Sequence, residues 1–201
     1  MFITFEGLDG SGKSTQANLL TNAIRETGRE VVATREPGGT PLGEQIREVL
    51  LNGDEASAWA EAALFAAARA ELVERVIAPA LESGAVVVCD RYLDSSLAYQ
   101  GIARGLGIDR VLQLNLPAIH GHLPDQTYLL LIDAAESARR VGRDGDRIER
   151  EDADFRGRVD QAYRELAETF PQRIEALDGT RGPTALAKEI FGRVRERLGT
   201  A

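Results

Sequence analysis

The chain has 201 residues, of which 43% are hydrophobic and 28% charged, and its formal net charge is −8 at pH 7. This length and composition suit one folded domain over residues 1–201, without repeats, low-complexity tracts or a domain linker. The negative charge argues against broad binding to nucleic acids or acidic membranes, and no apolar run is long enough to span a bilayer.

The single cysteine and the first residues of the chain bear on its location. Cys89 excludes an internal disulfide, and the chain opens on a strand pattern where a signal peptide would stand. We therefore expect a reducing, cytoplasmic location. The valines before Cys89 also predict that this thiol is buried and structural.

The first elements predicted along the chain are a strand, a glycine loop and a helix. An apolar run predicts the strand at 2–6, and an amphipathic pattern predicts the helix at 13–27. Between them, residues 7–14 read Gly-Leu-Asp-Gly-Ser-Gly-Lys-Ser and match the pattern G-x-x-x-x-G-K-[ST]. In this context the motif predicts a phosphate-binding loop, whose backbone N–H groups and helix N-terminus attract anions.

Two side chains of this loop carry its chemistry. Lys13 supplies a positive charge for the outer phosphates, and the Ser14 hydroxyl is a ligand for Mg²⁺. The loop residues expected to bind ATP are Gly7, Leu8, Asp9, Gly10, Ser11, Gly12, Lys13, Ser14 and Thr15.

The second predicted strand, at 30–34, ends in a loop that reads Thr-Arg-Glu-Pro-Gly-Gly at 34–39. Proline beside paired glycines is typical of a tight loop, and this loop lies at the carboxyl end of a strand beside the phosphate loop. A helix is expected at 41–51. Its Arg47 either reaches the same cleft or lies on a solvated face.

The helix expected at 58–82 carries an apolar stripe of mostly small residues, which runs from Trp59 and Ala63 to Leu81. Such a stripe allows close approach of another helix, either in the core or in a second copy of the chain, and both alternatives stay open. Phe65 and Arg69 are one turn apart on a neighbouring face. The residues alone equally fit an aromatic ring that covers an arginine stem.

The third strand is expected at 85–89 and is followed directly by Asp90 and Arg91. An aspartate at the end of an apolar strand is the expected partner of a phosphate loop, because it holds Mg²⁺ or its water. Arg91 could bind a second phosphate beside the metal, and a purely structural Asp–Arg pair is the alternative.

The remaining elements alternate in the same way. Helical patterns occur at 93–121 (with breaks), 134–142, 152–170 and 183–198, and strand patterns at 127–132 and 173–178. This alternation predicts an α/β fold of the P-loop type, with a five-stranded parallel sheet between two layers of helices. Ligands should then bind beyond the carboxyl ends of the strands. His120 and His122 fit a surface loop better than a metal site.

The segment 139–152 mixes five arginines with acidic residues and two glycines. A run of mixed charge is often plain solvated surface. An arginine-rich lid would also suit phosphoryl transfer, because late-arriving arginines neutralise the transition state and exclude water. We expect a lid at roughly 139–152. No Asn-Lys-x-Asp motif occurs, which disfavours a GTPase.

Four segments of the chain resemble thymidylate kinases: 6–14, 34–39, 64–69 and 90–101. The Asp-Arg-Tyr…Ser-Ser…Ala-Tyr-Gln-Gly segment at 90–101 is specific, and the Asp-Arg-Ile-Glu piece at 146–149 also fits. The resemblance implies a nucleoside monophosphate kinase that transfers the γ-phosphoryl group of ATP to dTMP, giving dTDP for dTTP synthesis. It also implies Mg²⁺ and a homodimer. The alternatives are another small-acceptor P-loop kinase and a nucleotide-dependent switch ATPase.

The resemblance implies a dTMP site in which Phe65 stacks on thymine, while Arg69, Ser96 and Gln100 contact the base. Tyr99 would lie under the sugar. The expected dTMP-binding residues are Asp9, Glu36, Arg47, Phe65, Arg69, Arg91, Ser96, Tyr99 and Gln100, and the expected metal ligands are Ser14 and Asp90.

The resemblance also implies the source of the catalytic arginine. Some members carry an arginine in the glycine loop, where this chain has Asp-Gly-Ser, so the arginine is expected from the lid, as in bacterial-type members. Arg143 and Arg147 are favoured over Arg140. Thr180 and Arg181 would flank adenine, and the Glu36–Pro37 bond would be cis. The expected catalytic set is Lys13, Asp9, Arg91, Arg140, Arg143 and Arg147.

Overall fold

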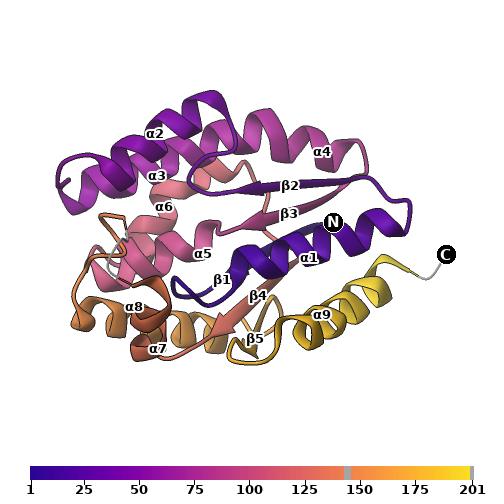
Figure 1. Ribbon diagram of the computed structural model, residues 1–201. Coiled ribbons are helices and arrows are strands. Elements are labelled where there is room, and N and C mark those ends of the chain that lie inside the picture. Colours follow the sequence, from indigo (N-terminus) through magenta and orange to yellow (C-terminus); the bar gives the residue numbers. More distant parts are fainter. Residues whose placement is uncertain (143–145, 200–201) are drawn as a thin grey trace.

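The computed structural model describes residues 1–142 and 146–199, and a five-stranded parallel sheet lies at its centre (Figure 1). The strand order is β2-β3-β1-β4-β5, and all four neighbouring pairs are parallel. The strands are β1 (Phe2–Glu6), β2 (Val31–Arg35), β3 (Val86–Asp90), β4 (Gln126–Leu131) and β5 (Ile174–Asp178). Helices cover both faces, so the predicted α/β fold is confirmed.

Each face of the sheet has its own hydrophobic core, because neighbouring residues of a strand point to opposite faces. In β1, Phe2 packs into one core and Ile3 into the other, and in β3 Val87 and Val88 divide in the same way. The apolar runs of the sequence are therefore strands buried on both faces, as a parallel sheet requires.

Two helices cover one face and the remaining helices gather on the other face and at the ends of the strands. α1 (Lys13–Glu26) and α9 (Pro183–Leu198) lie side by side in Figure 1 and bury Leu20, Ile24 and Ile190 against the sheet. The other helical segments are α2 (Pro41–Asn52), α3 (Ala58–Leu72), the π-helical turn η1 (Val73–Ile77), α4 (Ala78–Glu82), α5 (Leu93–Ser96), the π-helical turn η2 (Leu97–Ala103), α6 (Ile108–Ile119), α7 (Ala134–Val141) and α8 (Ala153–Thr169).

The small-residue stripe expected at 58–82 belongs partly to the core and partly to the surface. Ala66, Val73 and Ile77 are buried, whereas Trp59 and Ala63 are exposed. The face of α3 near its N-terminus is therefore open.

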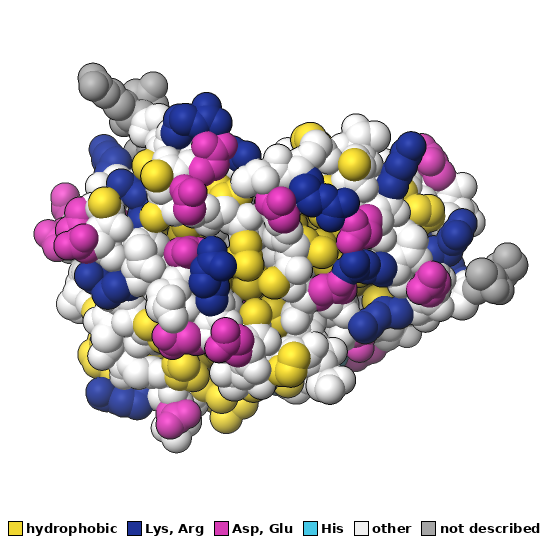
Figure 2. All heavy atoms as spheres, turned by 90° about the horizontal axis from the view of Figure 1, so that it is seen from below, with side chains coloured by type: hydrophobic (Ala, Val, Ile, Leu, Met, Phe, Trp, Pro, Cys, Tyr) yellow, Lys and Arg dark blue, Asp and Glu magenta, His cyan; other side chains and the backbone are white. Residues whose placement is uncertain are grey.

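The described residues show how charge is distributed on one face of the molecule and whether any helix could span a membrane. On the face shown in Figure 2, basic and acidic side chains are interspersed rather than sorted by sign. Among the helices of residues 1–142 and 146–199, none combines the length and the apolar character that a membrane span needs. Cys89 is buried, as the sequence predicts.

Candidate active site

The phosphate loop joins β1 to α1, and its backbone explains its glycines. Gly7 and Gly10 have φ angles of 136° and 76°, which side chains rarely adopt. A Cβ at Gly7 would lie 2.4 Å from the Leu130 carbonyl oxygen, so this position has no room for a side chain. Lys13 begins α1 and is buried, and its Nζ donates to the Leu8 carbonyl oxygen at 2.9 Å.

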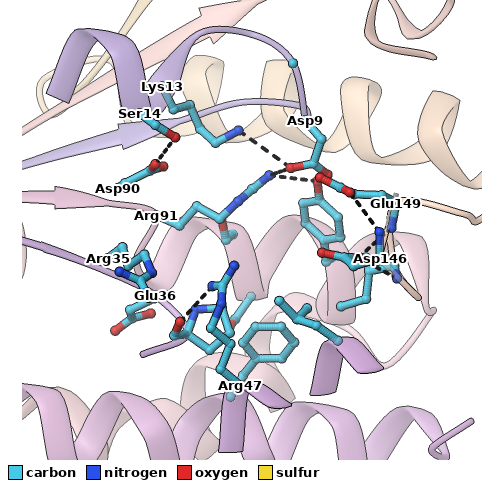
Figure 3. A pocket seen from close by; sticks show the side chains of 18 of the residues that line it. Asp9, Lys13, Ser14, Arg35, Glu36, Arg47, Asp90, Arg91, Asp146 and Glu149 are labelled. Carbon is cyan, nitrogen blue, oxygen red and sulfur yellow. Dashed lines mark hydrogen bonds and ion pairs between the residues drawn. The ribbon is translucent and has the colours of Figure 1, made fainter. Parts of the chain in front are cut away.

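The parallel sheet brings the ends of β1, β2 and β3 to the edge where this loop lies. Asp90 ends β3, and the Ser14 hydroxyl donates to its Oδ2 at 2.5 Å (Figure 3). Glu36 and Pro37 follow β2, and the peptide bond between them is cis, as expected. Residues from three distant parts of the chain thus meet at one site.

Arg91 lies at the centre of this site and has a left-handed backbone, with φ 69°. One end of its guanidinium pairs with Asp9 (Figure 3). The other end donates to Ser95 Oγ at 3.0 Å and to the Tyr163 hydroxyl at 3.1 Å. These contacts fix Arg91 beside the phosphate loop, 3.3 Å from the Tyr99 hydroxyl.

Two cations flank the carboxylate of Asp9. Arg91 pairs with it, and Lys13 Nζ lies 3.8 Å from its Oδ1. Burial alone would raise the pKa of Asp9, but Arg91 and Lys13 outweigh burial and lower the pKa to about 2. Asp9 is therefore ionised at neutral pH.

A cavity of about 450 Å³ opens in front of these groups and continues to α2, α3 and η2. Most expected site residues line it: Asp9, Gly10, Gly12, Lys13, Ser14, Thr15, Glu36, Arg47, Phe65, Asp90, Arg91, Ser96, Tyr99 and Gln100. Seven further residues also line it: Arg35, Pro37, Leu51, Ser95, Asp146, Ile148 and Glu149. All seven lie in segments that the sequence analysis named, but none of them was given a binding or catalytic role there.

Arg69 does not line the cavity and is fully buried behind it. Its Nη2 donates to Glu36 Oε2 at 2.5 Å and its Nη1 to Ser96 Oγ at 3.1 Å. Asn115 also accepts from it. In this structure Arg69 supports the wall that Glu36 and Ser96 form, instead of contacting the cavity as expected.

The arginines expected in the lid have different surroundings. Arg140 donates to the carbonyl oxygens of Gly10 and Gly179, at 3.0 and 3.3 Å, so it lies against the phosphate loop. Arg147 lies outside the cavity lining, because its guanidinium binds Glu61 at 2.8 Å and the Leu50 carbonyl oxygen at 2.9 Å. Arg143 lies outside the described residues.

The loop after β5 neighbours the phosphate loop without lining the cavity. The Thr180 hydroxyl donates to Asp178 at 2.6 Å, and Arg181 pairs with Glu189 at 2.6 Å. Gly7, Leu8 and Ser11 likewise shape the phosphate loop but do not line the cavity.

Two buried carboxylates near the site were not predicted, although the sequence held a signal for each. Glu6 ends the apolar strand β1, and Glu61 interrupts the alanine-rich α3. Glu6 is the only charged residue of β1, and Glu61 is the only one between Ala58 and Ala68. Buried charges are rare unless they are paired. Both side chains accept several hydrogen bonds, described below.

Together, this sheet order, the phosphate loop and a cavity that continues from Lys13 past Arg91 to Phe65 define a P-loop phosphotransferase whose cavity extends beyond the phosphate loop.

Comparisons with known proteins identify the family. The thymidylate kinase family model matches residues 5–190. The thymidylate kinase of Pelotomaculum thermopropionicum is 48% identical, with 98% of this chain and 94% of that protein covered. That of Deinococcus radiodurans is 46% identical, with 98% and 97% covered. A crystal structure of thymidylate kinase from Ehrlichia chaffeensis superimposes with a TM-score of 0.81 at 33% identity, over 97% of this chain and 98% of the other. The chain belongs to the thymidylate kinase family, as its sequence motifs indicated.

Proposed function

We propose that the cavity holds ATP and dTMP end to end, with their phosphates meeting between Lys13 and Arg91. As a member of the thymidylate kinase family, the chain transfers the γ-phosphoryl group of ATP to dTMP and releases dTDP and ADP. The observation that carries the arrangement is that both cations face Asp9 within one continuous cavity.

The donor side is built from the phosphate loop. Its N–H groups and Lys13 would bind the β- and γ-phosphates of ATP, and the positive end of α1 adds to their attraction. Arg140 donates to the Gly10 carbonyl oxygen at 3.0 Å and so contacts the loop that would bind these phosphates. We therefore favour Arg140, together with Arg143, as the source of charge during transfer.

The acceptor side begins at Arg91 and ends at Phe65. Arg91 and Arg47 would hold the phosphate of dTMP, and Arg47 is already anchored to the Pro37 carbonyl oxygen at 2.9 Å. The Tyr99 hydroxyl donates to Asp9 Oδ2 at 3.1 Å, and this contact supports our proposal that both groups lie beside the sugar. Phe65 would then stack on thymine.

The base would be bound by side chains at the far end of the cavity. Ser96 and Gln100 line this part of the wall, and we propose that they contact the thymine edge directly. Arg69 would act through Ser96 and Glu36, because its own atoms are enclosed.

Family members are ATP-dependent kinases that use a divalent metal, and we propose Mg²⁺ here. The test is whether the chain offers suitable oxygen ligands, because Mg²⁺ prefers a few protein oxygens together with waters and phosphates. Ser14 Oγ and Asp90 meet at the mouth of the phosphate loop, and Oε1 of buried Glu36 has no hydrogen-bond partner among the described residues. These residues fit the ion, which would neutralise phosphate charge when bound.

We also propose that two chains pair in solution through α3 and α6. Trp59 and Leu116 are 39% and 52% exposed on these two helices, and the small side chain of exposed Ala63, one turn after Trp59, allows close approach. We further propose a cytoplasmic enzyme of one domain, 1–201, with its lid at roughly 139–152.

A coupled assay across nucleoside monophosphates tests the function. With ATP and Mg²⁺, dTMP should be the best acceptor, and release of ADP should depend on it. Preference for another acceptor would identify a different small-molecule kinase. Release of ADP at the same rate without any acceptor would indicate a switch ATPase instead.

A further inference from the structure

Glu61 is a buried carboxylate that has no proposed contact with either ATP or dTMP. It lies in the first turn of α3, one turn before Phe65, and is 1% exposed. It does not line the cavity. Its four hydrogen-bond contacts instead reach two other elements, both of which contribute to the cavity wall.

The first element is η2, which carries Gln100. Gln100 Nε2 donates to Glu61 Oε1 at 2.9 Å, and Arg104 binds both carboxylate oxygens at 3.2 Å. Burial alone would raise the pKa of Glu61, but the hydrogen bonds from Arg104 and Gln100 outweigh it and lower the pKa. Glu61 is therefore an ionised group that can only accept hydrogen bonds.

This contact fixes the orientation of the Gln100 side-chain amide. Because Glu61 accepts only, Gln100 must turn its NH₂ group toward Glu61, which leaves its Oε1 as the acceptor for a ligand. Thymine carries a donor, N3–H, on its pairing edge, whereas cytosine carries an acceptor at N3. An amide held this way favours thymine over cytosine.

The second element is the inner lid segment, residues 146–151. Arg147 Nη2 donates to Glu61 Oε2 at 2.8 Å, and Arg104 pairs with Glu151 at 2.5 Å. The segment is a closed turn, because Asp146 Oδ1 accepts from the backbone N–H groups of Ile148 and Glu149, both at 2.9 Å. Fixing Arg147 therefore also fixes Ile148 and Glu149 on the cavity wall.

We infer that Glu61 is a positioning residue for base selection: its carboxylate orients the Gln100 amide toward thymine and, through Arg147, holds the inner lid segment against the same site. The inference rests on the proposed assignment of Gln100 to the base. It gives Arg147 an anchoring role.

The test compares Glu61→Gln with the wild-type enzyme, using dTMP and dCMP as acceptors. A glutamine at 61 can donate as well as accept, so the Gln100 amide is free to turn. We expect the ratio of kcat/KM for dTMP over dCMP to fall about tenfold, as for one lost hydrogen bond, while KM for ATP changes less than about twofold. Glu61→Asp keeps an acceptor-only charge and should retain most of the selectivity.

Two further variants separate positioning from plain stability. Glu71→Gln removes another ion-paired carboxylate of α3, which lies 3.6 Å from Arg75. It should change neither the dTMP over dCMP ratio of kcat/KM nor KM for ATP. Arg147→Gln releases the lid segment but leaves Glu61 against Gln100, so it should raise KM for dTMP without changing the dTMP over dCMP ratio.

Three outcomes decide the matter. Wild-type selectivity in Glu61→Gln would overturn the inference, even if that variant melts at a lower temperature. If Glu61→Gln does not fold, a loss of selectivity in Arg147→Gln would overturn it instead. A wild-type enzyme that does not use dTMP would refute the proposed function itself, which is a distinguishable result.

Discussion

Replacing Glu6 with glutamine should remove a pH dependence of stability that the fold imposes. Glu6 is fully buried at the end of β1. Its carboxylate accepts from the Tyr92 N–H at 2.8 Å, from Ser95 Oγ at 2.6 Å and from the Tyr163 hydroxyl at 2.9 Å. Ser95 and Tyr163 also hold Arg91, so Glu6 supports the centre of the site.

The pKa of Glu6 sets the size and sign of the effect. Burial raises the pKa from 4.5 to about 7, the negative charge of Asp94 adds to the shift, and Arg91 opposes it. Between these values the folded protein holds a proton that the unfolded chain has released. The stabilisation is therefore complete below pH 4.5 and is lost as pH rises through about 7. At about 1.36 kcal/mol per pKa unit, the free energy of unfolding should fall by about 3 kcal/mol over this interval.

Urea denaturation of the wild type and Glu6→Gln across this pH range measures the effect. Glutamine should be tolerated, because the hydroxyls of Ser95 and Tyr163 can turn to accept its N–H groups. All other titrating groups are common to both proteins, including buried Glu36, so the difference between the two curves reports the charge of Glu6 together with its effect on neighbouring groups. Glu26→Gln, on the exposed side of α1, is the matched control. Parallel curves for the wild type and Glu6→Gln would refute the reasoning.

Three other predictions concern the metal, the base and the dimer. Asp90→Asn should raise the Mg²⁺ concentration for half-maximal rate by about tenfold or more, measured by titration with ATP saturating; an unchanged midpoint would exclude Asp90 from the metal site. The kcat/KM for dUMP should be lower than that for dTMP by about 10–200-fold, because one methyl contact is lost; equal values would contradict an apolar pocket for the methyl group. Ala63→Glu should convert dimers to monomers in sedimentation experiments, and a dimer that survives this charge would place the interface elsewhere.

Patterns that are local in the chain predicted most of the fold. All five strands lie within one residue of the expected ranges. The helical pattern expected at 93–121 is interrupted between η2 and α6, where Gly105 and Gly107 have positive φ angles. Apolar runs and glycine positions are set by neighbouring residues, so a sequence displays them directly.

The directions of buried charged side chains could not be predicted in the same way. Glu61 and Arg147 are 86 residues apart in the chain, and Glu6 and Tyr163 are 157 apart. Arg69 meets Glu36 across 33 residues. Their residue types indicated charge at the site, but only the packing of helices against the sheet decides which carboxylate an arginine reaches. The sequence therefore did not predict that Arg69 and Arg147 are paired with buried carboxylates outside the cavity lining.

The charge of the cavity wall supports the proposal that a cation and a lid arginine take part in binding the two nucleotides. Four basic and five acidic side chains line it, so the wall itself is not positive. The Arg91–Asp9 pair uses one of these cations internally. Two polyanions cannot approach such a wall closely unless a divalent ion and lid arginines offset their repulsion. Arg147 is bound to Glu61 away from the cavity, whereas Arg140, itself paired with Glu136, contacts the phosphate loop, and this difference supports the proposal that Arg140 supplies part of that charge.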